Sequence, residues 1–310
     1  MTPLVIAHRG ASAYLPEHTL DAKSLAHRMG ADYIEQDVVA SRDDELVVLH
    51  DIYLDRVTNV AECFPARARD DGRYYVRDFD LKELRSLSVW ERMNADGSVV
   101  YPGRFPAKSG DFTISTFAEE LEFIRQLNTN SGRQVGIYPE IKRPAWHREE
   151  GIDIAPGFLK VITDDGFDES DDPVYIQCFD FAELKRLKVE FDCPFKLVQL
   201  IGENSWGEAE TDFDFIRTAA GIAELAETVD AIGPWIPYLY ELTDNIPRPG
   251  DLIQRAHAAG LAVHPYTFRA DELPPGFSSF EDLVRFFVVD VGIDGLFTDF
   301  PDRVVQLRLP

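Results

Sequence analysis

Titratable and cationic side chains directly follow several short apolar runs of this chain. Val5-Ile6-Ala7 leads into His8-Arg9-Gly10, and other runs end at Glu35-Gln36-Asp37, at His50-Asp51 and at Glu140-Ile141-Lys142. Charged groups at the end of a strand add nothing to a hydrophobic core, so their recurrence indicates a functional site. Carboxylates, imidazoles and basic side chains together are what a metal-assisted reaction at a phosphate requires.

The spacing of Glu35 and Asp37 predicts a metal site. They are two positions apart, so on a strand both side chains point to the same face. Two carboxylates inside a barrel repel each other unless a cation lies between them, and Glu140 could supply a third oxygen ligand from a neighbouring strand. Three carboxylates with water suit one hard divalent cation, Ca²⁺ ahead of Mg²⁺, better than zinc. An isolated Glu-x-Asp would more simply be a solvated strand end with ordinary salt bridges.

His8 and His50 are the candidates for catalytic acid and base, because an imidazole pKa of about 6.5 permits proton exchange near neutrality. Arg9 and Lys142 are the candidates for phosphate binding, and Arg9 could in addition form a salt bridge with Glu17. A lone histidine is more often structural. Four histidines are interpreted in that way, whereas His18 stands apart because it lies in the same loop as His8: His27, His147, His257 and His264.

Eight aromatic residues allow two interpretations. They could wall a pocket for a small polar group, or they could belong to local hydrophobic cores, which is the commoner case. The eight are Tyr53, Phe64, Tyr74, Tyr75, Tyr101, Phe179, Trp235 and Tyr266.

The elements that must position these residues follow a regular pattern. Short apolar runs alternate with amphipathic stretches along most of the chain, which is typical of successive β-α units. Eight such units predict an α/β fold, a closed (β/α)8 TIM barrel, whose active residues gather at the C-terminal ends of the strands. We expect strands near 4–7, 32–39, 135–140, 173–178, 195–200, 229–232, 261–266 and 294–298, and helices near 18–29, 116–128, 155–164, 180–190, 215–227, 250–259, 279–289 and 301–308.

Two segments interrupt this pattern within the single domain of residues 1–310. Residues 40–50 predict a return strand after a turn at Arg42-Asp43, which would bring His50 roughly opposite Glu35. Residues 51–113 are too long for an ordinary barrel loop and contain one expected helix at 80–88. We interpret 51–113 as an inserted subdomain that caps the C-terminal mouth of the barrel, because it follows the second strand.

Composition narrows the class of partner. The 310 residues are 45% hydrophobic and 28% charged, with a net charge of −24. This charge argues against nucleic acid or an anionic membrane as the main partner, and no apolar run is long enough to predict a membrane span. We expect a small-molecule substrate and no stable membrane insertion, with a homodimer left open. A phosphate substrate would need local positive charge. The three cysteines, Cys63, Cys178 and Cys193, lack metal-ligand spacing and are interpreted as structural thiols.

The compartment is left open by the residues themselves. The first expected strand follows directly after Met1-Thr2-Pro3, so no signal peptide is expected in this sequence. The protein is then either cytoplasmic or a mature periplasmic or secreted domain whose leader was removed.

Beyond single residues, long stretches of the chain resemble the glycerophosphodiester phosphodiesterase family, in particular its bacterial periplasmic branch. They are VIAHRGASAYLPEHTLDAKS, GADYIEQDVVASRDDELVVLHDIYLDRVTNVA, GIYPEIKRP, VYIQCFD, LVQLIG, VHPYTFRAD and GLFTDFPD. The resemblance implies that Glu35, Asp37 and Glu140 bind the metal, that His8 and His50 are the catalytic pair, and that Arg9 and Lys142 contact phosphate. It also implies an inserted subdomain and an exported protein. One departure is His18, where many relatives outside this branch have asparagine.

The expected reaction is hydrolysis of glycerophosphodiesters, such as glycerophosphocholine, to glycerol 3-phosphate and an alcohol. One histidine would deprotonate the nucleophile and the other would protonate the leaving alkoxide. The nucleophile is either water or the substrate's own 2-hydroxyl, which would form a cyclic phosphate. Two competing interpretations are a phospholipase D-like lipid hydrolase on the same barrel, disfavoured by the acidic composition, and a binding protein that has lost turnover, disfavoured by the intact candidate residues.

Overall fold

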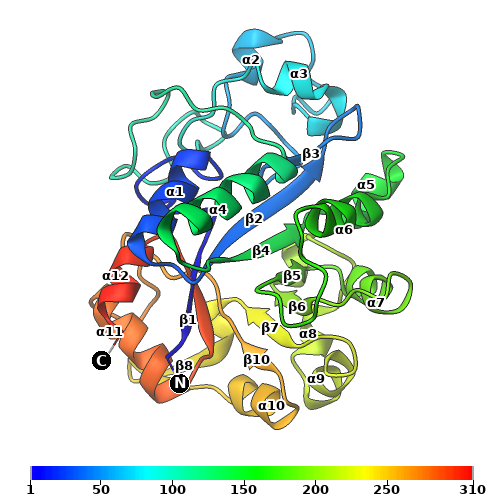
Figure 1. The fold of residues 1–310 in the computed structure, drawn as a ribbon. Helices are drawn as coiled ribbons and strands as arrows, with labels where there is room; N and C mark the ends of the chain where they lie inside the picture. The colour runs from blue at the N-terminus through cyan, green and yellow to red at the C-terminus, as the bar shows by residue number, and fades with distance from the viewer. Residues whose placement is uncertain (1, 309–310) are drawn as a thin grey trace.

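Eight parallel strands surround a common interior in the computed structural model, which describes residues 2–308 (Figure 1). Neighbouring strands follow the order β10-β7-β6-β5-β4-β2-β1-β11. Their bounds are β1 Leu4–Ala7, β2 Tyr33–Ala40, β4 Gly136–Ile141, β5 Tyr175–Cys178, β6 Lys196–Ile201, β7 Ala231–Pro234, β10 Ala262–Val263 and β11 Gly295–Thr298. All eight expected strands are therefore present.

The sheet curves round until its two end strands, β10 and β11, approach each other. The amide of Asp294 donates to the carbonyl of Val263 at 3.1 Å, and the amide of Phe297 donates to the carbonyl of Pro265 at 3.0 Å. The amide of Phe268 likewise donates to the carbonyl of Phe297 at 2.8 Å. These bonds join the short strand β10 and its continuation to β11. The predicted (β/α)8 TIM barrel is confirmed, as a nearly closed barrel.

Side chains alternate between the barrel interior and the surrounding helices, as strand geometry requires. On β2, Ile34 and Val38 belong to the large apolar cluster that packs against the helices. Glu35 and Asp37 lie between these two residues along the strand, and their side chains face the barrel interior instead. A second cluster, which includes Ile6, Tyr138, Val198 and Phe297, fills the interior below the carboxylates. The predicted common face of Glu35 and Asp37 thus results from strand periodicity.

The helices lie around the outside of the barrel (Figure 1). They are α1 Leu20–Met29, α4 Phe117–Ser131, α5 Pro144–Glu149, α6 Ile154–Asp164, α7 Phe181–Val189, α8 Phe213–Ile216, α9 Ala219–Leu225, α10 Leu252–Ala258, α11 Phe280–Arg285 and α12 Pro301–Gln306. Side-chain caps begin several of them, for example Thr19 at α1, Thr116 at α4 and Asp180 at α7. Among the described residues, no helix is both long and apolar enough to cross a membrane.

Two of the helix predictions for the barrel need correction. The single helix expected at 215–227 is wrong, because Thr218 leaves the helical conformation and caps the new helix α9 by accepting from the amide of Gly221 at 3.1 Å. A Cβ at Gly221 would lie 2.3 Å from the carbonyl oxygen of Phe215, so the close approach of α8 and α9 requires glycine there. The helix expected at 279–289 exists, but after α11 it continues as a π-helix over Phe286–Val291.

The predicted return strand is present as β3, Leu46–Val48, antiparallel to β2. Its register pairs Val38 with Val48, and the amide of Leu49 donates to the carbonyl of Asp37 at 2.9 Å. The same register places His50 level with Gln36, one residue from the predicted Glu35. A short strand pair that was not predicted, β8 Tyr240–Thr243 with β9 Ile246–Pro249, follows β7.

Residues 51–113 form an irregular segment beyond the C-terminal end of β2 (Figure 1). It contains the short helices α2 Val60–Cys63 and α3 Leu81–Leu84 and the 3-10 helix η1 Val76–Asp78. Only half of the helix expected at 80–88 forms. The segment has an apolar cluster of its own, in which Leu54, Val57, Val60, Phe79 and Leu84 are buried.

Candidate active site

A cavity of about 200 Å³ opens at the C-terminal ends of the strands, and we call it the barrel cavity. Of the seven site residues predicted from the sequence, six line it: His8, Arg9, Glu35, Asp37, His50 and Glu140. Lys142 does not line it. Its ammonium is buried beside the cavity, 2.9 Å from a Glu140 oxygen and 3.5 Å from Nε2 of His50. The structure therefore brings all seven residues to one place, with Lys142 behind Glu140.

The three carboxylates come from adjacent strands. Asp37 on β2 pairs in register with Glu140 on β4. Glu35 precedes Asp37 by two residues on β2, so its side chain lies on the same face of the strand. All three are almost completely buried, at 2% exposure for Glu35, 0% for Asp37 and 5% for Glu140. The side-chain amide of Gln177 on β5 donates from Nε2 to Oε1 of Glu35 at 3.4 Å. Three carboxylates that lie close together and are shielded from water are unfavourable unless positive charge compensates them.

The protein's own cations supply only part of that compensation. Burial, together with the charge of Asp37, raises the pKa of Glu35 well above its ordinary value. Burial also raises the pKa of Glu140 well above its ordinary value, although Lys142 opposes this shift. Asp37 behaves in the opposite way. Burial favours its neutral form, but Lys142, His50 and His18 outweigh burial and hold the pKa of Asp37 well below its ordinary value.

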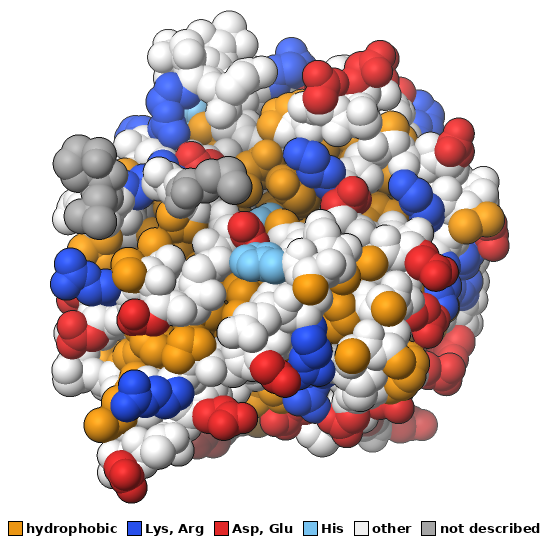
Figure 2. Space-filling model, turned by 90° about the horizontal axis from the view of Figure 1, so that it is seen from below, with side chains coloured by type: hydrophobic (Ala, Val, Ile, Leu, Met, Phe, Trp, Pro, Cys, Tyr) orange, Lys and Arg blue, Asp and Glu red, His pale blue; other side chains and the backbone are white. Residues whose placement is uncertain are grey.

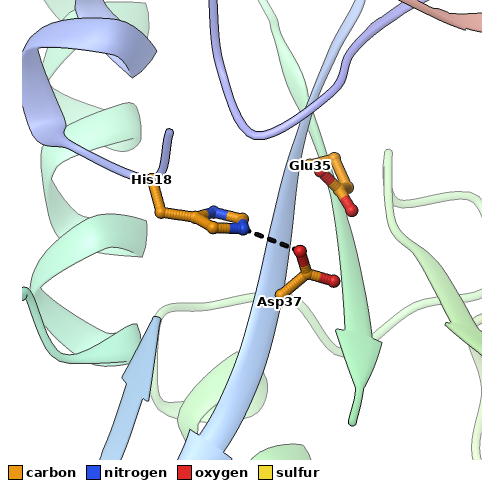
Figure 3. Close-up of side chains that lie close together, drawn as sticks. All are labelled: His18, Glu35 and Asp37. Carbon is orange, nitrogen blue, oxygen red and sulfur yellow. Dashed lines mark hydrogen bonds and ion pairs between the residues drawn. The ribbon is translucent and has the colours of Figure 1, made fainter. Parts of the chain in front are cut away.

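These residues fit a bound cation. Oδ1 of Asp37 is buried without a hydrogen-bond partner among the described residues, and a metal would satisfy it. His18, Glu35 and Asp37 each offer a ligand atom within 4.8 Å of the others, so this group could hold a metal ion (Figure 3). Among the described residues this group contains His18 in place of Glu140, which the sequence predicted as the third ligand. Because hard cations prefer oxygen ligands, His18 is better suited to orient Asp37 than to bind the ion itself.

His18 belongs to a buried network of hydrogen bonds and an ion pair that was not predicted from the sequence. Its Nε2 lies 2.7 Å from Oδ2 of Asp37, and its Nδ1 lies 3.2 Å from the ammonium of Lys23. Lys23 is itself fully buried and forms an ion pair with Glu120 at 2.8 Å, while its ammonium also donates to the carbonyl of Glu35. Lys23 lies on α1 and Glu120 on α4, so two outer helices fix the carboxylate strand from behind. The sequence signal for this pair was weak: Lys23 shares the buried face of α1 with Ala22, Ala26 and His27, and Glu120 lies among apolar residues on the buried face of α4.

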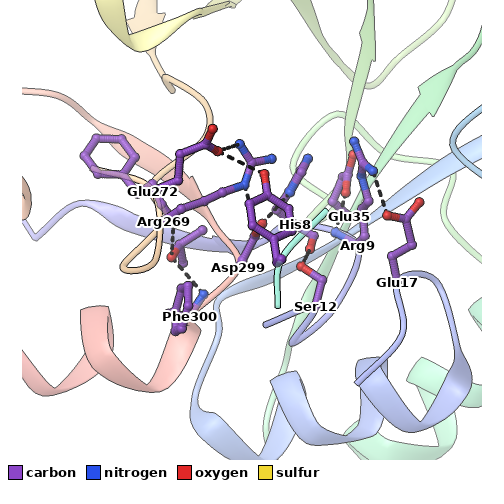
Figure 4. A network of polar contacts seen from close by, with 12 residues as sticks. His8, Arg9, Ser12, Glu17, Glu35, Arg269, Glu272, Asp299 and Phe300 are labelled. Atoms are coloured by element: carbon purple, nitrogen blue, oxygen red, sulfur yellow. Dashed lines mark hydrogen bonds and ion pairs between the residues drawn. The ribbon is translucent and has the colours of Figure 1, made fainter. Parts of the chain in front are cut away.

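His8 is oriented by the carboxylate of Asp299, which directly follows β11 (Figure 4). Nδ1 of His8 lies 2.6 Å from Oδ1 of Asp299. Burial lowers the pKa of His8 to about 4, assisted by Arg9, so the ring is neutral near pH 7. If Nδ1 carries the proton that Asp299 accepts, Nε2 is left unprotonated and can accept one from a substrate.

His50 has an equivalent partner in Asp51. Its Nδ1 lies 2.5 Å from Oδ1 of Asp51, and burial lowers its pKa, assisted by Arg9 and Lys142. The sequence singled out the pair His50-Asp51 but assigned no role to Asp51. Each candidate histidine therefore has one ring nitrogen on a carboxylate, the arrangement that fixes tautomer and orientation in acid–base catalysis.

Both orienting carboxylates contact an arginine from the 51–113 segment. Arg92 donates to Oδ2 of Asp51 at 2.7 Å, and Arg104 donates to Oδ2 of Asp299 at 2.7 Å. Arg269 donates to the same oxygen of Asp299 at 2.8 Å (Figure 4). Burial opposes ionisation of these carboxylates, but Arg92 at Asp51 and Arg269 at Asp299 help to hold their pKa values well below the ordinary range. The sequence did not identify Arg92 or Arg104, because neither lies at a strand end.

Arg9 adopts a left-handed backbone conformation with φ of 58°, and this directs its amide inward. The amide of Arg9 donates to Glu35 at 2.5 Å, and its guanidinium donates to Glu17 at 2.9 Å, which confirms the predicted salt bridge (Figure 4). Gly10 follows with φ of +89°, and a Cβ there would lie 2.8 Å from the backbone of Ala22. The glycine of the sequence motif is therefore required for α1 to pack against this loop.

The aromatic residues divide between the two interpretations. Phe179, Trp235 and Tyr266 line the barrel cavity, as the pocket interpretation predicted. Tyr101 lines a neighbouring cavity. The other four, Tyr53, Phe64, Tyr74 and Tyr75, belong to the apolar cluster of the 51–113 segment. The three cysteines are free thiols, with Cys178 and Cys193 buried and Cys63 exposed.

Comparisons with known proteins agree along the whole chain. The model of the glycerophosphoryl diester phosphodiesterase family matches residues 8–303. A glycerophosphodiester phosphodiesterase of Haemophilus influenzae is 42% identical over 98% of this chain and 89% of its own length. Another from Treponema pallidum is 35% identical over 98% of this chain and 91% of its own. The crystal structure of an Oleispira antarctica phosphodiesterase with its product sn-glycerol-3-phosphate has the same fold, with a TM-score of 0.66 at 22% identity, covering 99% of this chain and 96% of that one.

Proposed function

Since this chain belongs to the glycerophosphoryl diester phosphodiesterase family, we propose that it hydrolyses glycerophosphodiesters, such as glycerophosphocholine and glycerophosphoethanolamine, to glycerol 3-phosphate and an alcohol. The observation that carries this proposal is the convergence of two carboxylate-bound histidines and three buried carboxylates on the barrel cavity. No other site among the described residues combines these groups at the strand ends.

The proposed cofactor is one divalent cation, Ca²⁺ in preference to Mg²⁺, held by Glu35, Asp37 and Glu140. The unpartnered Oδ1 of Asp37 and the raised pKa values of Glu35 and Glu140 support this assignment. When bound, such a cation would neutralise charge on a phosphate oxygen and orient the glycerol hydroxyls. Ca²⁺ suits the site because it accepts several carboxylate ligands in flexible geometry.

The two histidines carry the proton transfers in this proposal. One imidazole takes the proton of the attacking hydroxyl as its oxygen bonds to phosphorus. The other imidazole, in its doubly protonated form, gives its Nε2 proton to the alkoxide as the P–O bond to the departing alcohol breaks, so the two rings end with their protonation states exchanged. Asp299 and Asp51 hold the rings in place, Arg9 contacts the phosphate, and Lys142 supplies the second positive charge from behind Glu140.

The attacking oxygen is either water or the substrate's 2-hydroxyl, and a substrate without the 2-hydroxyl distinguishes the two. Glycerophosphocholine and its 2-deoxy analogue would be compared with the same enzyme. Retained hydrolysis of the deoxy analogue requires attack by water, whereas an inert analogue indicates the cyclic route.

The 51–113 segment is proposed to cap the mouth of the barrel and to contribute to glycerol preference. Arg92 and Arg104 support this role, since both reach carboxylates at the rim. Deletion of 52–110 that left both turnover and glycerol preference unchanged would contradict it. We also propose, from the resemblance alone, that the protein is exported, and a homodimer stays an open alternative. Cell fractionation and analytical ultracentrifugation test these two points.

The decisive experiment is a coupled assay for released glycerol 3-phosphate. The purified enzyme is treated with EDTA, and Ca²⁺ or Mg²⁺ is then added back, alongside the His8→Ala variant. We expect EDTA to abolish activity, Ca²⁺ to restore it, and His8→Ala to lower kcat by roughly 10²-fold or more. Full activity in EDTA would contradict the cofactor assignment. Binding of glycerophosphocholine with metal but without release of product would indicate a binding protein, and activity only on intact phospholipid would indicate a lipid hydrolase.

A further inference from the structure

A second cavity lies on the other side of the two histidines, and we call it the insert cavity. Its volume is about 170 Å³, several times the roughly 30 Å³ that one water occupies in the liquid. His8, Arg9, His50 and Arg269 line both cavities. The other residues that line the insert cavity include Glu91, Tyr101 and Arg104 of the 51–113 segment. The proposed catalytic histidines therefore lie between the barrel cavity and the insert cavity.

A phosphodiester also has two ends, one on each side of its phosphorus. A phosphate placed at Arg9 and the histidines, which line both cavities, would direct one end into the barrel cavity and the other into the insert cavity. The barrel cavity contains the three carboxylates that are proposed to hold the cation, which suits the glycerol end. The insert cavity is left for the alcohol that departs.

The charges around the insert cavity are almost completely paired, as Figure 4 illustrates for part of the network. Arg92 donates to Asp51 and Glu17, Arg104 to Asp271 and Asp299, and Arg269 to Asp299 and Glu272. Arg9 donates to Glu17. Each of these four guanidinium groups therefore has carboxylate partners in the protein. They leave no free cation with which the cavity could attract a further negative group.

Glu91 is the exception to this pairing. Only 4% of its surface is exposed, and its Oε2 is buried without a hydrogen-bond partner among the described residues. Burial, together with the nearby charge of Glu17, raises its pKa to about 7. A carboxylate in this position is costly unless something donates to it. The cavity that it lines is large enough to admit such a donor.

We propose that the insert cavity binds the departing alcohol of the substrate, and that Glu91 selects alcohols that carry a cationic or hydrogen-bond-donating group, as choline and ethanolamine do. This inference rests on the proposed function. It assigns to the insert the recognition of the leaving alcohol, in addition to its contact with the histidine partners. Glu91 is then a specificity residue and takes no part in the proton transfers.

The test compares two substrates of the same shape. One is glycerophosphocholine, and the other is the ester of glycerol 3-phosphate with 3,3-dimethylbutanol, in which carbon replaces the charged nitrogen. We expect the wild-type enzyme to favour the choline ester in kcat/KM by about tenfold, which corresponds to about 1.4 kcal/mol of favourable interaction between the cationic nitrogen and Glu91. Glu91→Gln should reduce this ratio to near one, mainly by raising KM for the choline ester, with the neutral ester almost unaffected. Glu62→Gln, an exposed position of the same segment, is the matched control.

The outcomes are separable. An equal loss on both esters in Glu91→Gln, or an unchanged ratio, would overturn the subsite. Calorimetric titration with choline chloride provides a readout without turnover, in which wild-type protein should bind choline more tightly than Glu91→Gln does. If the wild-type enzyme released no glycerol 3-phosphate from either ester, the proposed function would fail. In that case choline binding that depends on Glu91 would still support the subsite, and its absence would overturn the subsite too.

Discussion

Single residues at this site rarely act alone, because almost every charged group has a partner that fixes it. His8 and His50 each place Nδ1 on a carboxylate, at 2.6 Å and 2.5 Å. An imidazole held in this way has one defined tautomer and one free nitrogen, which makes it an effective proton carrier. The carboxylates are therefore as necessary to the proposed chemistry as the histidines.

Asp299→Asn tests this dependence at His8. The amide can donate to Nδ1, which would favour the other tautomer and leave a protonated Nε2 facing the substrate. We expect kcat to fall by roughly 10²-fold or more with little change in KM.

Asp271→Asn is the matched control for that variant. Asp271 contacts Arg104 at 2.8 Å, as Asp299 does, but has no contact with a histidine. Steady-state kinetics of both variants at equal thermal stability make the comparison. Equal effects of the two substitutions would indicate that the loss comes from Arg104 and not from the tautomer of His8.

Among the elements, the irregular 51–113 segment has the most direct connection to the site. Its arginines reach Asp51 and Asp299 from outside the barrel, so the segment holds both histidine partners. A segment with this role must keep a defined structure, and its own apolar cluster provides one.

Arg104→Ala should lower kcat by about tenfold, because Asp299 loses one of its two guanidinium partners. The effect should disappear in an Asp299→Asn background, since both changes act through the same contact. Arg92→Ala should instead add its full effect to Asp299→Asn, because it acts at Asp51. A double-mutant cycle on kcat measures both couplings. Additive effects of Arg104→Ala and Asp299→Asn would show that Arg104 has a separate role.

Helices α1 and α4 are joined beneath the site by the buried pair of Lys23 and Glu120. Lys23→Met would leave Glu120 without a cation in a fully buried position and should cost about 3–5 kcal/mol of unfolding free energy at neutral pH. Burial already raises the pKa of Glu120, and loss of Lys23 would raise it further. The folded state then binds a proton that the unfolded state releases above a pKa of about 4.3, so the variant should lose stability as pH rises.

Urea unfolding of Lys23→Met from pH 4 to pH 8 measures this slope. The double variant Lys23→Met with Glu120→Leu removes both charges and is the control. It should recover most of the lost stability and lose the added pH dependence. A double variant as unstable as Lys23→Met would show that Lys23 matters through His18 and the backbone of Glu35 and not through Glu120.

At the scale of the whole molecule, a net charge of −24 surrounds a site whose three buried carboxylates are only partly compensated by the protein's own cations. On the face in Figure 2, acidic and basic side chains are interspersed with apolar ones, and neither sign forms one continuous patch. Positive charge is instead gathered at the barrel cavity, which Arg9 and Arg269 line and behind which Lys142 is buried next to Glu140. This arrangement agrees with the expectation that an acidic protein needs local positive charge to bind a phosphate.

Acid sensitivity is a second property of the whole molecule, because several histidines are buried in neutral form. His264 shows the effect away from the catalytic groups. It is 1% exposed, its Nδ1 lies 2.8 Å from the hydroxyl of Tyr138, and burial lowers its pKa to about 4. A lowered pKa means that the unfolded chain binds a proton first, so stability is complete above about pH 6.5 and is lost as pH falls toward 4.

His264→Gln should therefore show a weaker dependence on acid than the wild type. The difference in unfolding free energy between the two proteins should shrink by about 3 kcal/mol between pH 7 and pH 4. Denaturant unfolding at a series of pH values measures it, with the exposed His257→Gln as control. A constant difference across this range would mean that His264 is already charged in the folded protein.

Much of this architecture could be predicted from the sequence, because strand periodicity and strand ends leave a clear pattern. All eight barrel strands, the return strand and the convergence of the seven site residues were predicted, and the family was recognised. The single helix over 215–227 was wrong, because a polar cap at Thr218 overrides an apolar pattern that continues through it. The pattern also gave little information on 51–113, where short helices and loops have no period.

The sequence by itself determined which residues could do chemistry, since Glu35 and Asp37 share a face by spacing alone and His8 ends a strand. Tertiary structure decided which groups act together. Asp299 lies 291 residues from His8, and Arg104 lies 195 residues from Asp299, so these contacts exist only because β11 pairs with β1 and the insert folds over the rim. Local spacing carries no information about such pairs, because closing the barrel is what creates them.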